Sequence, residues 1–489
     1  MKKAILLTAM MAAGMSKANN QITIYSGNHQ GALNTSQLTN AHNIPGFAVV
    51  NEHRQAEFTE GRFTLSINDV AEHIDPTTVT LKLDKNPDDI QILDQDFQFD
   101  LVSTEKLLLK YIDQSITVNH NQGDESIQTT GILLSTEGGL TLRTEAQKIT
   151  TIKDWNQIEF PELPGGLLTR PTLVWLMESQ VRGNQSFALS YQTKGMTWWV
   201  DYNILLSNQK KQCRMDLSTW VTLVNKSGTG FTETQLKLIA GDVNRVQRNQ
   251  PRAIRKEAFA MTADSQFSEE SLFEYHLYQL PRRVDLPNNA TKQIPFLPAI
   301  YDIECRHVLE YNGSQMQRIN YHRPVTDRNY LQTGNTKIDA FLLFDNDSEN
   351  QLGHPLPAGR MRVNMMDSQG DNPQFIGEDY IDHTADNKTI SLKLGQSFDV
   401  TGSRTQIDFQ SEKHSMTEQF RIVLDNQKNH PQLVEVIEPL YRWSQWQIIA
   451  QSDDHEKLNA STIKFTVEVP AKSSKTVTYQ VRYDWQPGQ

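Results

Sequence analysis

One stretch, residues 354–384, gathers the side chains best able to do chemistry. It reads HPLPAGRMRVNMMDSQGDNPQFIGEDYIDHT, with Arg362 before a turn-rich segment and Glu378, Asp379 and His383 after it. Two carboxylates could act as acid and base in a hydrolase, and a histidine beside them could complete a metal site. An extended strand argues against the metal, because Asp379 and His383 would lie about 13 Å apart at ~3.3 Å per residue. A bulge at Gly377 or a turn at DHT could bring them closer.

The same stretch has a simpler interpretation as a β-hairpin that turns around Gly370. Its Gly, Asn, Asp and Pro residues are typical of loops. The predicted pairing sets Arg362 opposite Glu378, Arg360 opposite Tyr380, and Met365 opposite Phe375. Each such contact stabilises a hairpin by about 0.2–1 kcal/mol. We therefore expect these charges to serve folding, with ligand binding as the alternative.

The segment IAGDVNRV offers a second set of candidate ligand groups. Asp242 and Arg245 could orient a ligand, or they could cap a turn and pair with each other. Elsewhere NKSGTGF lacks the lysine of a phosphate-binding loop, and the chain holds no HExxH or GxSxG motif. The sequence therefore predicts no cofactor and no catalytic residue.

The segment FDNDSEN raises the possibility of calcium, because Asp345, Asp347 and Glu349 alternate as loop ligands do. An EF-hand loop would also need Gly at its sixth position and Glu at its twelfth. Those positions hold Asn350 and Leu356. A turn is the better prediction.

Tryptophans cluster in TWWVDY and YRWSQWQ. If exposed, Trp198, Trp199, Trp443 and Trp446 could stack on sugar rings, whereas buried they would pack the core. Core packing is the expectation.

The first eighteen residues have the form of a secretory signal peptide. Lys2 and Lys3 precede an apolar run, and Ser16 and Ala18 provide small residues before a cleavage point. The run is too short to span a bilayer, and no later segment approaches about 20 apolar residues. We expect a periplasmic or secreted protein with no membrane span.

Charge argues against nucleic acid as a partner. The full chain carries a net charge of −11, and its first 18 residues hold three lysines and no acid, so the mature chain would carry −14. Binding to phosphates needs clustered Lys and Arg. The basic stretch RVQRNQPRAIRK has no interleaved aromatics, so we interpret it as a solvated loop.

Apolar residues alternate with polar ones along most of the chain. Ile463 to Val469 and Val477 to Tyr483 are the clearest cases, and Ser103 to Tyr111 is the best helix candidate. The predicted fold is mainly β: several antiparallel β-sandwich domains with few short helices.

The length of 489 residues predicts about three domains. We expect a signal peptide (1–18), an amino-terminal β-rich domain (19–182) and a C-terminal β-sandwich domain (183–489) with a mobile loop at 247–272. The Pro and Gly residues of PELPGGLLTRP mark the boundary. No repeat of fixed period is evident.

The two cysteines, Cys213 and Cys305, lie 92 positions apart. In an oxidising compartment they could form a disulfide, and otherwise they would be two buried thiols. Neither lies in a CxxC motif, so metal binding is not indicated.

Several motifs in order resemble one bacterial family. They are LSYQTKGMTWWVDYNILL, DLSTWVTLVNKSGTGFTETQLKLIAGDVNRV, FEYHLYQLPRRVDLPNNATKQIPFL, LGHPLPAGRMRV, FIGEDYIDHT and LKLGQSFDV. The chain resembles the domain of unknown function numbered forty-one thirty-nine, which includes proteins labelled mucoidy inhibitor A-like, over residues 185–485. Some relatives carry a coiled coil between their halves, and this chain does not. The resemblance implies a β-rich, often exported protein, and no settled reaction.

These observations favour an exported cell-envelope protein that acts as a non-catalytic binding or structural module. Its partner would be a glycan, a peptide or an envelope protein. The alternative is a periplasmic hydrolase that uses paired carboxylates such as Asp242, Glu378 or Asp379.

Overall fold

The computed structural model is mainly β, and its described residues form several sheets and two short α-helices. It describes residues 18–27, 33–122, 125–207, 212–241, 268–272, 275–314, 323–367 and 372–486. The predicted fold class is confirmed. The predicted helix is α2 (Thr104–Lys110), in which the Ser103 side chain accepts a hydrogen bond from the Lys106 N–H at 3.2 Å. The predicted signal peptide lies outside the described residues, except for Ala18.

Twenty of the strands form four units that share one pairing scheme. In each unit the first strand pairs with the second, the second with the fifth, and the third with the fourth, all antiparallel. Unit I consists of β1 (Ala18–Tyr25), β2 (Phe47–Phe58), β3 (Gly61–Ile67), β11 (Thr172–Ser179) and β12 (Gly183–Thr193). Unit II consists of β13 (Met196–Leu206), β14 (Arg214–Asn225), β15 (Phe231–Ala240), β18 (Val284–Leu286) and β19 (Ala290–Pro295). Unit III consists of β21 (Arg306–Tyr311), β22 (Asp339–Asn346), β23 (Gly359–Met366), β24 (Pro373–Ile381) and β25 (Lys388–Gln396). Unit IV consists of β26 (Val400–Ser411), β27 (Ser415–Asn426), β28 (Gln432–Pro439), β31 (Thr462–Val469) and β32 (Ser473–Asp484).

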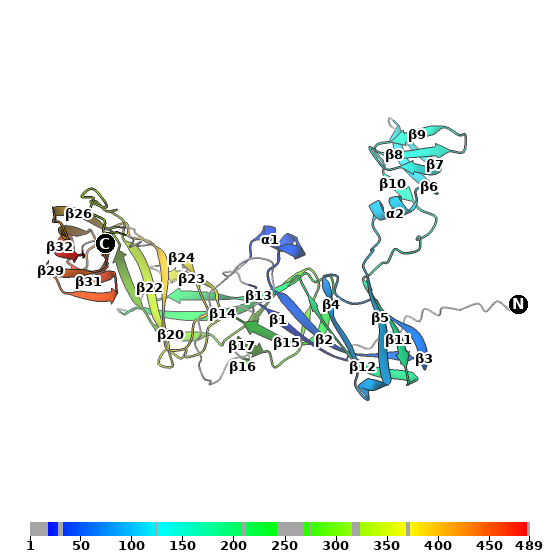
Figure 1. Cartoon of the computed structure of the whole chain (residues 1–489), viewed down its shortest axis with the longest axis horizontal. Helices are drawn as coiled ribbons and strands as arrows, with labels where there is room; N and C mark the ends of the chain where they lie inside the picture. The colour runs from blue at the N-terminus through cyan, green and yellow to red at the C-terminus, as the bar shows by residue number, and fades with distance from the viewer. Residues whose placement is uncertain are drawn as a thin grey trace.

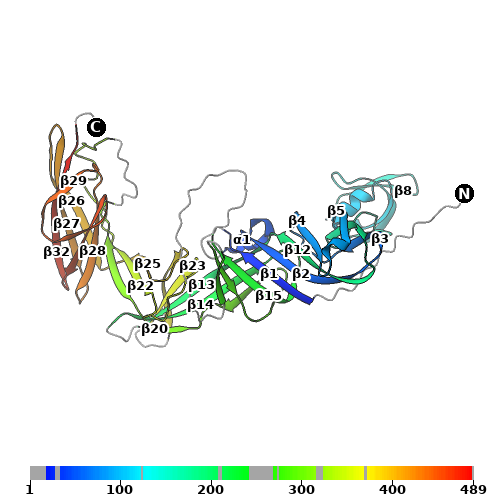
Figure 2. The ribbon, with the colours of Figure 1, turned by 60° about the horizontal axis from the view of Figure 1, so that its bottom comes forward.

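Successive units are joined by parallel strand pairs. The third strand of each later unit pairs with the first strand of the unit before it: β15 with β1, β23 with β13, and β28 with β21. Sheets therefore continue from one unit into the next, and the units follow one another along the long axis of the molecule (Figures 1 and 2). The predicted boundary at residue 183 falls inside unit I, because β12 pairs with β2 along its length.

Additional strands widen the units. Units I and IV each gain two strands, which pair with the fifth and the fourth strand of the unit. In unit I these are β4 (Ile74–Leu83) and β5 (Ile90–Gln98), and in unit IV they are β29 (Trp446–Gln451) and β30 (His455–Asn459). Unit II gains β16 (Ser268–Leu272), β17 (Tyr275–Gln279) and β20 (Ile300–Glu304). The predicted loop at 247–272 thus ends in strand β16, and its residues 247–267 lie outside the described residues.

A small domain is inserted between β5 and β11, which are themselves hydrogen-bonded neighbours. It contains α2 and the sheet of β6 (Ser115–Gln122), β7 (Glu125–Ser135), β8 (Leu140–Thr144), β9 (Ile149–Ile152) and β10 (Gln157–Glu159). Its own core includes Leu108, Tyr111 and Leu133. Figure 1 shows it standing away from the line of units.

A buried asparagine ends the second strand of units II, III and IV. The Nδ2 groups of Asn225, Asn346 and Asn426 each donate to a carbonyl in the connection to the third strand and to one near the end of the fourth strand or just beyond it, at 2.8–3.1 Å. Each Oδ1 accepts a backbone N–H from the following turn. Unit I has Phe58 at this position. The asparagine therefore ties three strand ends together in three of the four units.

Candidate functional site

A surface with several interacting charged, polar and aromatic side chains lies on the outer face of the sheet that units II and III share. Along β13, Val200, Tyr202 and Ile204 point into the core, so the alternate residues point outward. Two adjacent rows of side chains cross four strands there. The aromatic row is Trp220, Asp201, Arg360 and Tyr380, and the polar row is Ser218, Asn203, Arg362 and Glu378.

Asp201 organises the aromatic row. Its Oδ2 accepts hydrogen bonds from Trp199 Nε1 at 2.8 Å and Thr222 Oγ1 at 2.7 Å, and its Oδ1 accepts one from an Arg360 guanidinium nitrogen at 3.1 Å. Trp199 is buried beside Ile44, which ends the helical segment α1 (Thr35–Thr39) and η1 (Ala41–Asn43). The Asp201 carboxylate thus connects the Arg360 guanidinium to the buried Trp199 and Thr222 side chains.

The ends of the aromatic row are open to solvent. Trp220 is 37% exposed and Tyr380 is 44% exposed. They lie three strands apart, about 14 Å at ~4.8 Å per strand. Between them is the Asp201 and Arg360 pair, so one aromatic ring lies on either side of a hydrogen-bonded charge pair.

The polar row confirms part of the predicted hairpin. Arg362 lies opposite Glu378, with Nε donating to Oε2 at 3.2 Å, and Arg360 lies opposite Tyr380. The predicted pairing of Met365 with Phe375 is wrong. A bulge after Val363 shifts the register by one residue, so Met365 lies opposite Gln374.

Asp379 and His383 do not join Glu378. Asp379 lies opposite Met361 on the other face of β24, and its carboxylate accepts the backbone N–H groups of Tyr380 at 2.8 Å and Lys393 at 2.7 Å. His383 Nδ1 accepts the N–H of Ala358 at 3.0 Å. Both side chains therefore hold backbone in place. Asp242 and Arg245 lie outside the described residues.

The predicted turn at FDNDSEN is confirmed. The Asp347 carboxylate accepts the N–H of Asn350 at 3.0 Å, and Asp345 forms an ion pair with Arg306 at 3.7 Å. Across the described part of the chain, no three His, Cys, Asp or Glu side chains are arranged to hold a metal ion.

The predicted packing role is confirmed for all four tryptophans. Trp198, Trp199 and Trp443 are buried, and Trp446 is half-buried against the core of unit IV, with the Lys457 ammonium 4.7 Å from its ring. The exposed tryptophan of the aromatic row is Trp220. Alternation along β13 and β14 could have indicated Asp201 and Trp220 as outward residues, but only the parallel pairing with β23 brings Arg360 beside them.

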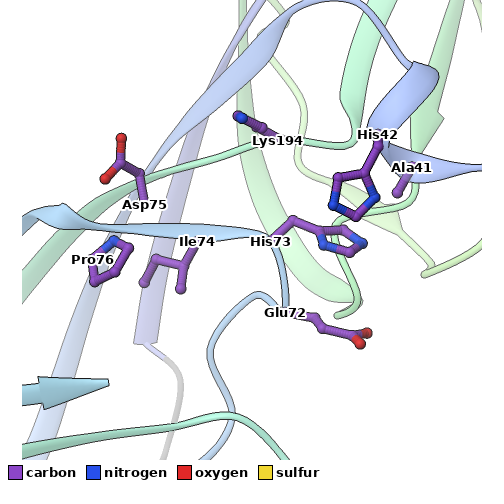
Figure 3. Close-up of a pocket in the computed structure, with 8 residues that line it drawn as sticks. All are labelled: Ala41, His42, Glu72, His73, Ile74, Asp75, Pro76 and Lys194. Carbon is purple, nitrogen blue, oxygen red and sulfur yellow. The ribbon is translucent and has the colours of Figure 1, made fainter. Parts of the chain in front are cut away.

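A second polar site lies where units I and II meet. A surface pocket of about 410 Å³ is lined by His42, Glu72, His73, Asp75 and Lys194, among others (Figure 3). The rings of His42 and His73 meet edge to face with centroids 5.1 Å apart. Burial lowers the pKa of His73; Glu72 opposes that shift, and His42 and Lys194 add to it. The pocket mixes both signs of charge and selects no single class of ligand.

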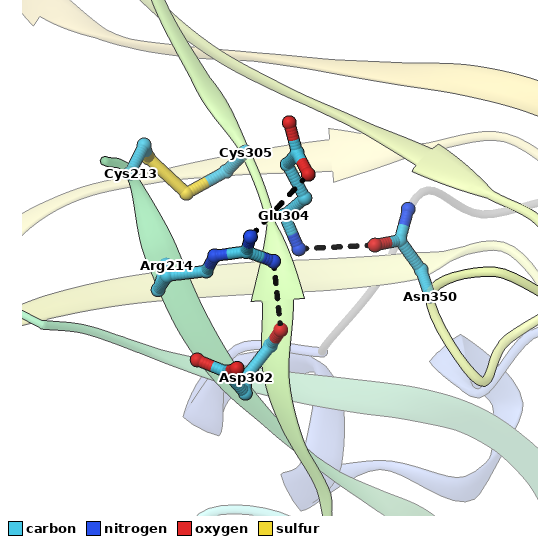
Figure 4. Close-up of a disulfide and its surroundings, with 6 residues drawn as sticks. All are labelled: Cys213, Arg214, Asp302, Glu304, Cys305 and Asn350. Atoms are coloured by element: carbon cyan, nitrogen blue, oxygen red, sulfur yellow. Dashed lines mark hydrogen bonds and ion pairs between the residues drawn. A yellow bond between two sulfur atoms is a disulfide. The ribbon is translucent and has the colours of Figure 1, made fainter.

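Cys213 and Cys305 form a disulfide, with Cα atoms 5.0 Å apart (Figure 4). The bridge joins the start of β14 to the start of β21, and therefore joins unit II to unit III. Beside it, Arg214 donates to the Asp302 carbonyl at 3.3 Å and pairs with Glu304 at 3.5 Å. The disulfide thus links units II and III covalently beside the sheet that carries the two rows.

No protein-family model matches the chain, and no curated protein matches it. The resemblance noted in the sequence therefore stays a prediction. Neither helix among the described residues has the length and apolar character needed to cross a lipid bilayer.

Proposed function

We propose that this protein is exported to the cell envelope and binds a glycan there, without catalysis, through the aromatic and polar rows. The observation that carries the proposal is the aromatic row itself. Exposed Trp220 and Tyr380 flank a guanidinium that Asp201 holds in place. Aromatic faces pack against the apolar faces of sugar rings, and fixed planar donors and acceptors orient hydroxyl groups.

The proposed surface is close to neutral in charge. Arg360 and Arg362 are balanced by Asp201 and Glu378, with which they form ion pairs. A neutral, hydroxyl-rich ligand suits such a surface better than a strongly charged polymer does. The disulfide is consistent with export, because disulfides persist in oxidising compartments.

A hydrolase that uses Glu378 and Asp379 receives no support. An acid and base pair needs both carboxylates on one side of the substrate, about 5–10 Å apart. Here the two side chains lie on opposite faces of β24, and both are engaged, Glu378 by Arg362 and Asp379 by backbone N–H groups.

Titration of the purified protein with soluble fragments of the cell-wall glycan, followed by tryptophan fluorescence and calorimetry, tests the proposal. Trp220→Ala and Arg362→Ala should each weaken binding about tenfold, equivalent to ~1.4 kcal/mol. Trp155→Ala is the matched control, since Trp155 is 39% exposed but lies in the inserted domain. Equal affinity in all three variants would contradict the proposal.

A further inference from the structure

Within the described part of the chain, the parallel pairing that joins successive units is missing at one strand, β3 of unit I. In units II, III and IV, the third strand pairs in parallel with the first strand of the preceding unit. No unit precedes unit I among the described residues. Its third strand, β3, ends its sheet, whose order is β3, β11, β5. Among the described residues β11 is the one strand hydrogen-bonded to β3.

The side chains of β3 alternate between apolar and polar, as they do in strands that are paired on both edges. Leu65 and Ile67 are buried in the core of unit I, and Phe63 is half-buried against it. Arg62, Thr64 and Ser66 alternate with them on the exposed face. An added strand would bring apolar side chains beside Phe63 and polar ones beside Thr64. Exposed backbone N–H and C=O groups at such an edge are a template for another chain.

At the opposite end of the row of units, which we call the rod, the edge of strand β26 is covered by another segment of the same chain. β26 is the first strand of unit IV, and among the described residues no later unit lies beside it. A cap segment, residues 332–336, lies along it instead: the N–H groups of Gln406 and Gly402 donate to the carbonyls of Gln332 and Thr336 at 2.8 and 3.1 Å, and that of Gly334 donates to Arg404 at 3.0 Å.

The cap segment is firmly held. The buried Arg404 side chain forms an ion pair with Glu438 at 2.9 Å and donates to the Leu331 carbonyl at 2.8 Å. The other first strands, β1, β13 and β21, already carry β15, β23 and β28. Among its described residues, a second copy of this chain therefore has no free first strand to offer to β3, and this favours a different protein as the occupant.

We propose that β3 is a docking edge for an extended strand of a partner envelope protein, paired in parallel as at the three internal junctions. The partner strand would alternate apolar residues, facing Phe63, Leu65 and Ile67, with polar ones. Docking would extend the rod by continuing the sheet of unit I. This proposal is independent of the glycan surface, which lies on another sheet.

Site-specific photo-crosslinking in cells that produce the protein tests the pairing. Benzoylphenylalanine is placed one position at a time at Arg62, Thr64 and Ser66. Leu176 serves as the control position, because it is 41% exposed on the same face, directly opposite Thr64, on the central strand β11. We expect adducts with one other polypeptide from the three β3 positions, well above those from Leu176.

Peptide mapping of the adducts by mass spectrometry decides the geometry. In parallel pairing, the partner residues captured from positions 62, 64 and 66 advance in the same direction, two residues at a time. Thr64→Lys, a charge that protects sheet edges, should lower the adduct yield several-fold with an unchanged melting temperature. Adducts at the level of Leu176, adducts to another part of this chain or to a second copy, or partner positions in reverse order would each overturn the proposal.

Discussion

Asp201 and Arg360 lie opposite each other across the parallel pair of β13 and β23, and their side chains are joined at 3.1 Å although 159 residues separate them in sequence. The pair is the polar link between units II and III on the outer face of their shared sheet. It also sets the orientation of the guanidinium in the proposed glycan surface. The Asp201 carboxylate therefore contributes both to the stability of the fold and to the proposed glycan-binding surface.

Two substitutions of Asp201 distinguish the role of its charge from its role as a hydrogen-bond acceptor. Asp201→Ala leaves the Trp199 indole and the Thr222 hydroxyl without this acceptor, and each unsatisfied buried group costs about 1–3 kcal/mol. We expect Asp201→Ala to lower the free energy of unfolding by about 3 kcal/mol in urea denaturation. Asp201→Asn keeps an acceptor oxygen and should cost about 1 kcal/mol. Equal losses in the two variants would contradict the assigned role.

The asparagine corner should contribute similarly in three units. Asn225, Asn346 and Asn426 are 3%, 0% and 0% exposed, and each satisfies backbone groups at three strand ends. Substitution by alanine should cost about 2–4 kcal/mol at each position, because buried carbonyl groups lose their donor. Asn184→Ala, at an exposed position, should change stability by less than about 0.5 kcal/mol. Chemical denaturation of the four variants measures these differences, and losses no larger than that of Asn184→Ala would rule out a common corner.

Local pairing was predictable from sequence, and long-range pairing was not. The hairpin that sets Arg362 opposite Glu378 follows from alternation and one turn. The bulge after Val363 leaves Ile376 without a register partner beside Gly377, and a glycine inside a strand often marks a bulge. The parallel pairing that places Arg360 beside Asp201 joins strands far apart in the chain, which periodicity cannot identify. The asparagine corners are separated by 121 and then 80 residues, so the repeat has no fixed period.

The site was predictable to the same extent. Arg362 and Glu378 were identified, because their pairing is local. Asp201 and Trp220 lie in recognised strands, but their importance depends on which strand lies next to each. The residues of the pocket at His42 and His73 come from three separate parts of the chain, and no spacing in the sequence connects them.

Loss of the disulfide should loosen the link between units II and III. In the chain-entropy model, closing a loop of this length stabilises a fold by about 4–5 kcal/mol. We expect the double variant Cys213→Ala, Cys305→Ala to melt at a lower temperature, with the wild-type protein falling to the same value under reducing conditions. The oxidised protein should show no thiol reactivity when unfolded. A wild-type melting temperature that reductant leaves unchanged would contradict this prediction.

Glu310 makes the junction of units III and IV sensitive to pH. It lies opposite Asp339 on β22 and opposite Glu435 on β28. Burial raises the pKa of Glu310, and the two neighbouring carboxylates raise it further, whereas the Lys393 ammonium opposes the shift. The folded protein therefore binds a proton on Glu310 at higher pH than the unfolded chain does. The ionised carboxylate costs stability above the folded-state pKa, and this cost is absent below the ordinary value of 4.5.

Glu310→Gln removes that cost at neutral pH. The variant should be more stable than wild type there, by about 0.2–1 kcal/mol for each like-charged neighbour relieved. The advantage should shrink as the pH falls through the raised pKa and vanish in acid. Urea denaturation across this pH range measures it, with Glu468→Gln, an exposed glutamate on β31, as the matched control. A stabilisation that does not change with pH, or one that Glu468→Gln reproduces, would show that the neighbouring carboxylates are not its cause.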